Sequence, residues 1–288
     1  MCPTWTKTRK NGIMPVPLFR RLVDEIAVHG VERLFLHLWG EPLVHPKIAE
    51  LVSYASEKPT IRETVMSTNA ALLNHDRAEG LLHSGLSRLV FSLDGATKET
   101  YETLRAGAQF DSTMQNVVQF LEIRNRKGSG PRVVFQIIEM KQTVNELAEF
   151  RRRWEPLLRA GDEISIKPYN QWADHDGALH KRGIPFRTPC FAFLWDFLAV
   201  TWSGIVLPCC YDCEAELVIG DSREQTLEQI WNGTALRELR AAHLNLDFQR
   251  FPLCEGCDHT TERLDADRLK RVIQSRLGIQ PTAATESV

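Results

Sequence analysis

Cysteine is the residue type in this chain whose spacing points most directly to chemistry. The sequence contains seven cysteines, and six of them fall between residues 190 and 257. Cys254 and Cys257 form a C-x-x-C pair, a spacing that lets two thiolates reach one metal. The other thiols of this region are Cys190, Cys209, Cys210 and Cys213. Thiols from three separate places could therefore converge on a zinc ion or on a cubane iron–sulfur cluster.

Three interpretations of these cysteines stay open at this point. In the first, the thiols are buried and bind nothing. In the second, zinc is held by the two C-x-x-C pairs, Cys210 with Cys213 and Cys254 with Cys257, while Cys190 takes no part. In the third, four thiolates hold an iron–sulfur cluster.

The composition favours a metal centre over a disulfide framework. The N-terminus has no apolar signal core and no apolar run is long enough to cross a membrane, so we expect a cytoplasmic protein with reduced thiols. The 35 Lys and Arg residues nearly balance 37 Asp and Glu residues, for a net charge of −2. This balance gives no electrostatic reason to expect a nucleic acid or a membrane surface as a partner.

The elements that must position the thiols follow from the hydrophobic pattern. Up to about residue 170, helical and strand-like segments alternate, which predicts an α/β fold with a parallel sheet and helices outside it, closed or half closed as a barrel. The expected strands are 33–38, 61–67, 88–93, 132–139 and 163–167. The expected helices are 18–26, 46–57, 75–84, 97–105, 111–127 and 144–159. Because such a barrel normally begins with a strand, its first strand is missing from this pattern.

The pattern changes after about residue 170. Two strands, Phe193–Thr201 and Ile205–Pro208, are predicted to form a hairpin around Ser203 and Gly204. A helix is predicted over Thr226–Leu244. We expect three parts, namely a partial barrel at 1–187, a small cysteine-bearing domain at 188–265 and a C-terminal helix and tail at 266–288.

The cysteine region carries the first of two family resemblances. The residues concerned are Cys190, Gly204, Cys209, Asp212, Gly220, Gln229-Ile230-Trp231, Arg240, Cys254 and Cys257. Their order and spacing resemble the SPASM/twitch domain of radical S-adenosylmethionine (SAM) enzymes, which carries auxiliary [4Fe–4S] clusters. The resemblance implies that Cys190, Cys209, Cys254 and Cys257 hold one auxiliary cluster. Cys210 and Cys213 would then be alternate ligands or remnants of a second cluster.

Three strand ends in the first half of the chain resemble the same superfamily. They are Trp39-Gly40-Glu41-Pro42, Ser67-Thr68-Asn69 and the run from Ser92-Leu93-Asp94-Gly95 through Tyr101 to Arg105. Alone, each turn is also compatible with an ordinary strand-ending loop. Together they imply a partial (β/α)6 TIM-like barrel followed by a small domain with a β-hairpin and a helix. The implied SAM-binding residues are Gly40, Glu41, Pro42, Asn69, Ser92, Asp94 and Arg105.

The chain departs from the superfamily at its N-terminus. The signature of these enzymes is C-x3-C-x2-C in the loop after the first barrel strand, and only Cys2 corresponds to it, as the third cysteine. We expect that the sequence begins inside this motif, so that the first two cysteines would precede Met1. The alternative is a degenerate protein that keeps its auxiliary cluster and has lost the cluster that binds SAM.

The resemblance also implies an activity. A reduced [4Fe–4S] cluster would cleave SAM to a 5′-deoxyadenosyl radical, which would oxidise or modify a carbohydrate-like or peptidyl substrate. An auxiliary cluster with four protein ligands would accept or relay an electron, and a flavodoxin or ferredoxin would supply the reductant. Two other functions are a non-catalytic iron–sulfur protein for electron transfer and a zinc-stabilised binding module.

Residues that could contact the substrate are polar groups near the last predicted strands. They are Gln136, Glu139, Lys167, Tyr169 and the loop Trp172–Asp176. The sequence does not identify the substrate itself.

Overall fold

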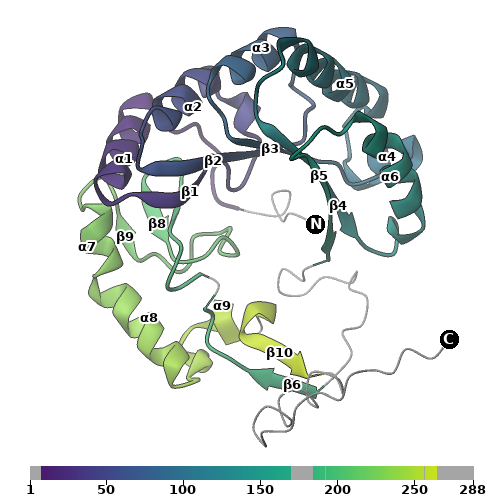
Figure 1. Ribbon diagram of the computed structural model, residues 1–288. Coiled ribbons are helices and arrows are strands. Elements are labelled where there is room, and N and C mark those ends of the chain that lie inside the picture. The colour runs from purple at the N-terminus through teal and green to yellow at the C-terminus, as the bar shows by residue number, and fades with distance from the viewer. Residues whose placement is uncertain (1–7, 170–183, 192, 256, 265–288) are drawn as a thin grey trace, which may run out of the picture.

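Five parallel strands form the sheet of the N-terminal part of the protein, and Figure 1 shows how this sheet curves. The computed structural model describes residues 8–169, 184–191, 193–255 and 257–264. The strands follow one another in chain order, and each pairs in parallel with the next. They are β1 (Val31–Phe35), β2 (Ile61–Thr68), β3 (Arg88–Ser92), β4 (Arg132–Glu139) and β5 (Glu163–Pro168). The predicted α/β half-barrel is therefore confirmed.

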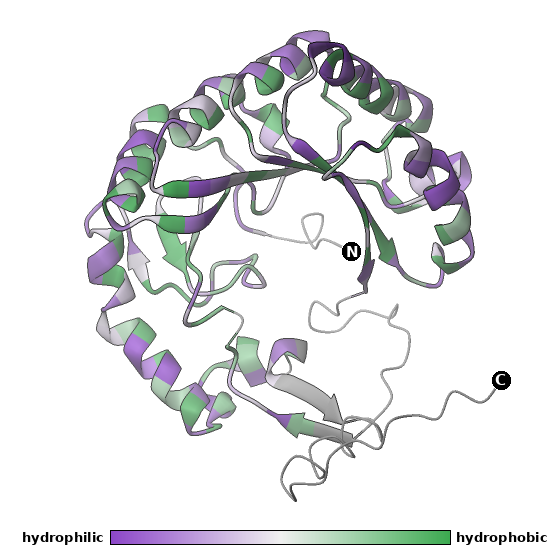
Figure 2. Ribbon diagram, in the orientation of Figure 1, coloured by the Kyte–Doolittle hydropathy of each residue, from purple (hydrophilic) through white to green (hydrophobic). Residues whose placement is uncertain are grey.

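Helices cover the outer side of this curved sheet (Figure 1). They are α1 (Val16–His29), α2 (Ile48–Ser56), α3 (His75–His83), α4 (Lys98–Leu104), α5 (Phe110–Lys127) and α6 (Leu147–Trp154). The outer helices mix hydrophobic and hydrophilic residues (Figure 2), as expected for helices with one buried face. Within the described ranges, no helix combines the length and the apolar character needed to cross a membrane.

Apolar side chains fill the layer between the sheet and the helices. On β4, the buried residues Val133, Phe135 and Ile137 belong to this layer. Phe135 stacks on Trp154 of α6, with ring centroids 4.4 Å apart. Because side chains alternate along a strand, Gln136 lies on the opposite, inner face of the half-barrel.

A second hydrophobic cluster organises the cysteine-rich region, with Leu194, Val206, Ile230 and Leu239 among its buried members. Short antiparallel strands pair in the order β7 (Ala199–Val200), β8 (Ile205–Leu207) and β9 (Gly220–Asp221). The turn between β7 and β8 contains Gly204, whose φ of 93° favours glycine. The helices here are α7 (Leu227–Trp231), α8 (Thr234–Leu244) and α9 (Pro252–Glu255).

Several predicted elements are shorter than expected. The helix expected at 144–159 is continuous only in α6, and a 3-10 turn containing Pro156 follows it. Proline interrupts the helix because it has no N–H to donate. The helix expected at 226–244 breaks into α7 and α8 at Gly233. The strand expected at 193–201 is present only as β7, and mostly turns precede it.

One antiparallel ribbon was not expected from the sequence. Strand β6 (Ile184–Arg187) pairs with β10 (Thr261–Leu264), so that Arg187 lies opposite Thr261. The ribbon therefore pairs a strand that precedes the predicted domain boundary at 187 with a strand that follows it. The boundaries at 187 and 265 stay predictions, and the expected tail at 266–288 lies outside the described residues.

Candidate functional site

The Glu41 carboxylate ties the loop after β1 to the end of β2. It accepts hydrogen bonds from the Thr68 hydroxyl at 2.6 Å and from the Asn69 backbone N–H at 2.8 Å. It also accepts the N–H of Leu43 at 3.0 Å. Gly40, with φ of 112°, precedes it in a conformation that other residues rarely adopt. The side chain of Glu41 thus holds the backbone of residues 40–42 in place.

His37 is a further group at this strand end. Its Nδ1 atom accepts the backbone N–H of Ser67 at 3.0 Å, which links β1 to β2. Burial lowers the pKa of His37 to about 4, from an ordinary value of 6.5. The imidazole is therefore neutral near pH 7.

Asp94 and Arg105 form an ion pair at the end of β3. The Arg105 Nη2 atom lies 2.7 Å from Asp94 Oδ2, and it donates to the Ser92 carbonyl oxygen at 2.8 Å. The side chain of Asp94 is only 3% exposed. Within the described ranges, the buried Asp94 Oδ1 and Arg105 Nε atoms have no hydrogen-bond partner. Such atoms are rare in folded proteins, and these two belong to residues predicted to bind SAM.

The Asn69 side chain stabilises the turn that follows β2. Its Oδ1 atom accepts the backbone N–H of Ala71 at 2.9 Å, and Ala70 adopts a positive φ of 60°. The structure therefore brings all three predicted strand ends to the carboxyl edge of one sheet. This is the edge at which barrel enzymes bind their substrates.

The inner face of the half-barrel presents a row of polar side chains. In the sheet register, Ser92 lies opposite Gln136, which lies opposite Ser165. Lys167 is two positions further along β5, on the same face. Glu139 is three positions after Gln136 on β4, so its side chain lies on the opposite face of the sheet. Tyr169 follows β5, and the predicted loop Trp172–Asp176 lies outside the described residues.

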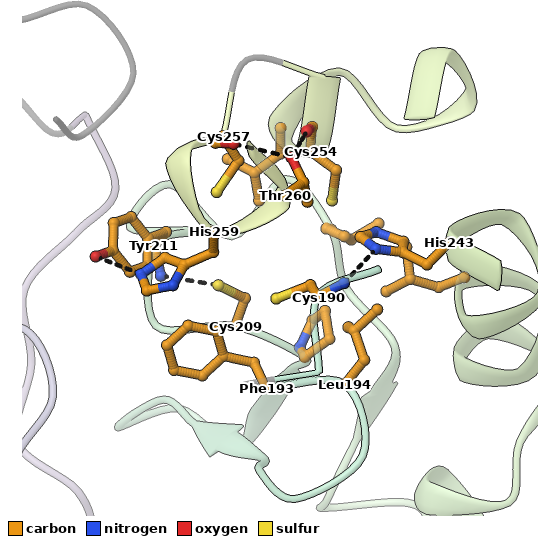
Figure 3. Close-up of a pocket in the computed structure, with 14 residues that line it drawn as sticks. Cys190, Phe193, Leu194, Cys209, Tyr211, His243, Cys254, Cys257, His259 and Thr260 are labelled. Carbon is orange, nitrogen blue, oxygen red and sulfur yellow. Dashed lines mark hydrogen bonds between the residues drawn. The ribbon is translucent and has the colours of Figure 1, made fainter. Parts of the chain in front are cut away.

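Four of the predicted thiols line one pocket (Figure 3). Cys190 follows β6, Cys209 follows β8, and Cys254 and Cys257 belong to α9 and the turn after it. No disulfide joins cysteines within the described ranges. Cys210 and Cys213 do not line this pocket. Cys2 lies outside the described residues.

Burial raises the pKa of two of these thiols. The pKa of Cys254 rises to about 12, mainly through burial and then through the neighbouring Cys257. Hydrogen bonding to Cys210, followed by burial, raises the pKa of Cys209. Without a cationic group the thiols of Cys209 and Cys254 would therefore stay protonated, whereas a bound metal centre would favour their thiolate forms.

The arrangement of the thiols fits a cluster with four cysteine ligands. Among the residues that the structure describes, no group of three or more His, Cys, Asp or Glu is placed to hold one metal ion. The four thiols instead surround a pocket (Figure 3). The set that lines the pocket also differs from the set predicted for zinc, since Cys190 and Cys209 replace Cys210 and Cys213.

Several residues around the pocket were not predicted from the sequence. The Tyr211 backbone N–H donates to Cys209 Sγ at 3.3 Å, and the Tyr211 hydroxyl lies 2.8 Å from His259 Nε2. His243 lines the same pocket and accepts the backbone N–H of Cys190. The sequence signal that could have identified His243 is its position on α8, four residues after Leu239 on the buried face of the helix.

A contact joins the two halves of the site. The Trp39 indole N–H donates to the carbonyl oxygen of Cys210 at 2.9 Å. The Arg9 guanidinium lies over the Trp39 ring, 5.1 Å from its centroid, and donates to the Cys213 carbonyl oxygen at 3.1 Å. The Glu214 carboxylate accepts the backbone N–H groups of Thr8 and Arg9. The segment from Cys210 to Glu214 is thereby anchored both to the loop after β1 and to residues 8 and 9.

Two family profiles match the chain. A profile described as the radical SAM superfamily covers residues 1–153, and SPASM, described as an iron–sulfur cluster-binding domain, covers residues 190–258. An AdoMet-dependent heme synthase from Methanosarcina barkeri is 24% identical across 77% of this chain and 74% of its own length. A GTP 3',8-cyclase from Rhodococcus opacus is 30% identical across 53% of this chain and 43% of its own length. The chain therefore spans less than half of that cyclase.

Solved structures with the same fold include two seen with AdoMet. BtrN in complex with AdoMet and 2-DOIA superposes with a TM-score of 0.58 at 19% identity, over 89% of this chain and 85% of its own. Native anSMEcpe with bound AdoMet gives 0.62 at 13% identity, over 95% and 93%. SuiB from Streptococcus suis, bound to precursor peptide SuiA, gives 0.62 at 18% identity, over 81% and 61%. At these identities the likeness concerns the fold.

Proposed function

The chain belongs to the radical SAM superfamily, and we propose that it is an enzyme that performs radical chemistry on a peptide or a small sugar-like molecule. Its cofactors are SAM and a [4Fe–4S] cluster. The observation that carries the proposal is the convergence of Cys190, Cys209, Cys254 and Cys257 on one pocket, beside a half-barrel whose strand ends share the superfamily's motifs.

The cofactors and the protein have separate tasks in this proposal. When bound, SAM and a reduced cluster supply a carbon-centred radical that removes a hydrogen atom from the substrate. The chain's own residues bind SAM, orient the substrate and exclude water from the reacting carbon.

Seven residues at the strand ends would hold SAM. They are Gly40, Glu41, Pro42, Asn69, Ser92, Asp94 and Arg105. Glu41 would act indirectly, because its carboxylate is occupied with the backbone and hydroxyl groups that fix the loop. Arg105 has an Nε–H without a partner among the described residues and could donate it to the carboxylate of SAM.

The substrate would bind against the inner face of the half-barrel. Support comes from Gln136, Ser165 and Lys167, polar residues that share this face with Ser92. Gln136 and Lys167 would contact polar or anionic groups of the substrate. Peptides and small molecules are suggested because SuiB has been seen with a precursor peptide and BtrN with 2-DOIA.

The cysteine pocket would hold the auxiliary cluster through four protein thiolates. A cluster with all four ligands from the protein leaves no iron open to the substrate. We therefore expect it to accept or relay an electron, which would make the net reaction an oxidation. A change at one iron site of this cluster when substrate is added, seen by Mössbauer spectroscopy, would contradict this role.

A second function is an iron–sulfur protein that transfers electrons without cleaving SAM, because the four thiols of the cysteine pocket would suffice to hold its cluster. A flavodoxin or ferredoxin would be the electron donor in either case.

One experiment separates the two functions. The protein is reconstituted with iron and sulfide without oxygen, reduced with dithionite and incubated with SAM, and 5′-deoxyadenosine and methionine are measured. The first function predicts that both products form and that Ser92→Ala lowers their rate. Iron–sulfur protein that yields neither product would support electron transfer alone.

A further inference from the structure

His243 occupies an unusual position beside the thiol pocket. It lies near the end of α8, its side chain is fully buried at 0% exposure, and it lines the pocket together with Cys190 (Figure 3). The ring of Phe248 packs edge-on against it, with centroids 5.0 Å apart. A buried histidine in an otherwise apolar helix stripe needs partners for both of its nitrogen atoms.

One nitrogen has a partner, and its bond defines the tautomer. The backbone N–H of Cys190 donates to Nδ1 of His243 at 3.2 Å. Because Nδ1 accepts a hydrogen bond, the ring proton resides on Nε2. His243 therefore fixes the backbone of a proposed cluster ligand and presents a donor at its other nitrogen.

The other nitrogen has no partner in the part of the chain that the structure describes. Nε2 is buried and makes no hydrogen bond there. Leaving a buried donor unsatisfied costs about 1–3 kcal/mol. Sulfur atoms are the natural acceptors in this pocket, because the thiol side chains of four cysteines line it.

We propose that His243 is a positioning residue of the auxiliary cluster, which orients Cys190 through Nδ1 and donates its Nε2–H to a sulfur atom of the cluster or of a cysteine ligand. The inference rests on the proposed iron–sulfur site. A donor to sulfur stabilises the reduced, more negative cluster and so raises its reduction potential. His243 thereby sets how readily the cluster accepts an electron.

Substitutions can separate the two nitrogen atoms. In His243→Asn, the amide oxygen can replace Nδ1 as acceptor for Cys190, but nothing replaces the Nε2 donor. In His243→Gln, the amide group reaches the position of Nε2 and can supply a donor. His83→Asn is the matched control, because His83 is exposed on α3 of the half-barrel.

The test compares iron and sulfide content and the midpoint potential of the reconstituted proteins. We expect His243→Asn to keep its iron but to have a lower potential than wild type. The potential of His243→Gln should lie between them, and that of His83→Asn should equal wild type. Protein with ¹⁵N-labelled histidine should show a hyperfine coupling to the reduced cluster that His243→Asn lacks.

The possible failures are distinguishable. Wild-type protein without iron and sulfide would overturn both this inference and the proposed function. Cluster-bearing His243→Asn with an unchanged potential, together with wild-type protein that lacks the ¹⁵N-histidine coupling, would overturn the role of His243 alone.

Discussion

The Trp39 indole nitrogen donates a hydrogen bond to the Cys210 carbonyl oxygen, across 171 positions of the sequence. Trp39 precedes Gly40 and Glu41 in the loop after β1, while Cys210 follows the pocket residue Cys209. One side chain therefore connects the loop proposed to bind SAM with the loop proposed to bind the auxiliary cluster. Arg9 extends the contact, since it lies over the Trp39 ring and donates to Cys213.

Trp39 and Arg9 should contribute jointly to stability. We expect Trp39→Leu and Arg9→Met each to lower the free energy of unfolding, and the double variant to lose less than the sum. Trp39 and Arg9 are both partly exposed, and the coupling should be about 0.5–1 kcal/mol, because a cation over an aromatic ring that water can still reach contributes on that order. Urea unfolding of the four proteins measures it, and strict additivity would mean that the contact has no energetic role.

Loss of a pocket thiol should abolish cluster binding. Replacing Cys190, Cys209, Cys254 or Cys257 by alanine removes one of four ligands, so each variant should lose most of its iron after reconstitution. Cys213→Ser is the control, because Cys213 does not line the pocket, and it should retain its iron. Iron retained in Cys190→Ala but lost in Cys213→Ser would point to a different ligand set.

Substitution of Glu41 should weaken SAM binding indirectly, because the Glu41 carboxylate fixes the loop and is not proposed to contact SAM. In Glu41→Gln, one acceptor oxygen becomes an NH₂ group that faces the N–H or hydroxyl donors of Leu43, Thr68 and Asn69. Losing one such bond should cost about 1–3 kcal/mol and loosen the loop. Equilibrium dialysis with SAM should show weaker binding, while the exposed Glu57→Gln should bind as wild type does. Unchanged affinity in Glu41→Gln would exclude a role for this clamp.

Acid should destabilise the half-barrel partly through His37. The folded-state pKa of His37 is about 4, below the ordinary 6.5, so the unfolded chain binds a proton more readily between these values. Its contribution is therefore fully present above about pH 6.5 and is lost as the pH falls toward 4.

The expected loss from His37 at pH 5 is on the order of 1 to 2 kcal/mol. His37→Asn keeps an acceptor for the Ser67 N–H but cannot take up a proton. We expect its unfolding free energy to fall less between pH 7 and pH 5 than that of wild type. The exposed His75→Asn should follow the wild-type slope, and equal slopes for all three proteins would refute the prediction.

The parallel sheet was predictable because its signals are local. Residues 133–138 are apolar except for Gln136, a run typical of a buried strand in a parallel sheet, and helix-ending residues such as Gly128 mark the boundaries. The strand expected at 33–38 was displaced, since β1 begins at Val31 and ends at Phe35. An apolar run continues beyond Phe35, but pairing with β2 rather than hydropathy decides where a strand ends.

The thiol pocket was predictable in part. The spacing of Cys254 and Cys257 and the resemblance to the SPASM domain indicated the four residues that line it. His243 and the bond from Trp39 to Cys210 could not be predicted, because both depend on packing between segments far apart in the chain. The β6–β10 ribbon was missed because its four-residue strands carry too little periodicity to identify.

The central claim is that the cysteine pocket holds an iron–sulfur cluster, and its most direct test is the metal and sulfide content of the reconstituted protein together with its Mössbauer spectrum. A cubane in the pocket predicts about four irons and four sulfides per chain with the spectrum of a [4Fe–4S] cluster. Zinc bound without sulfide, or protein that holds no metal, would contradict the account.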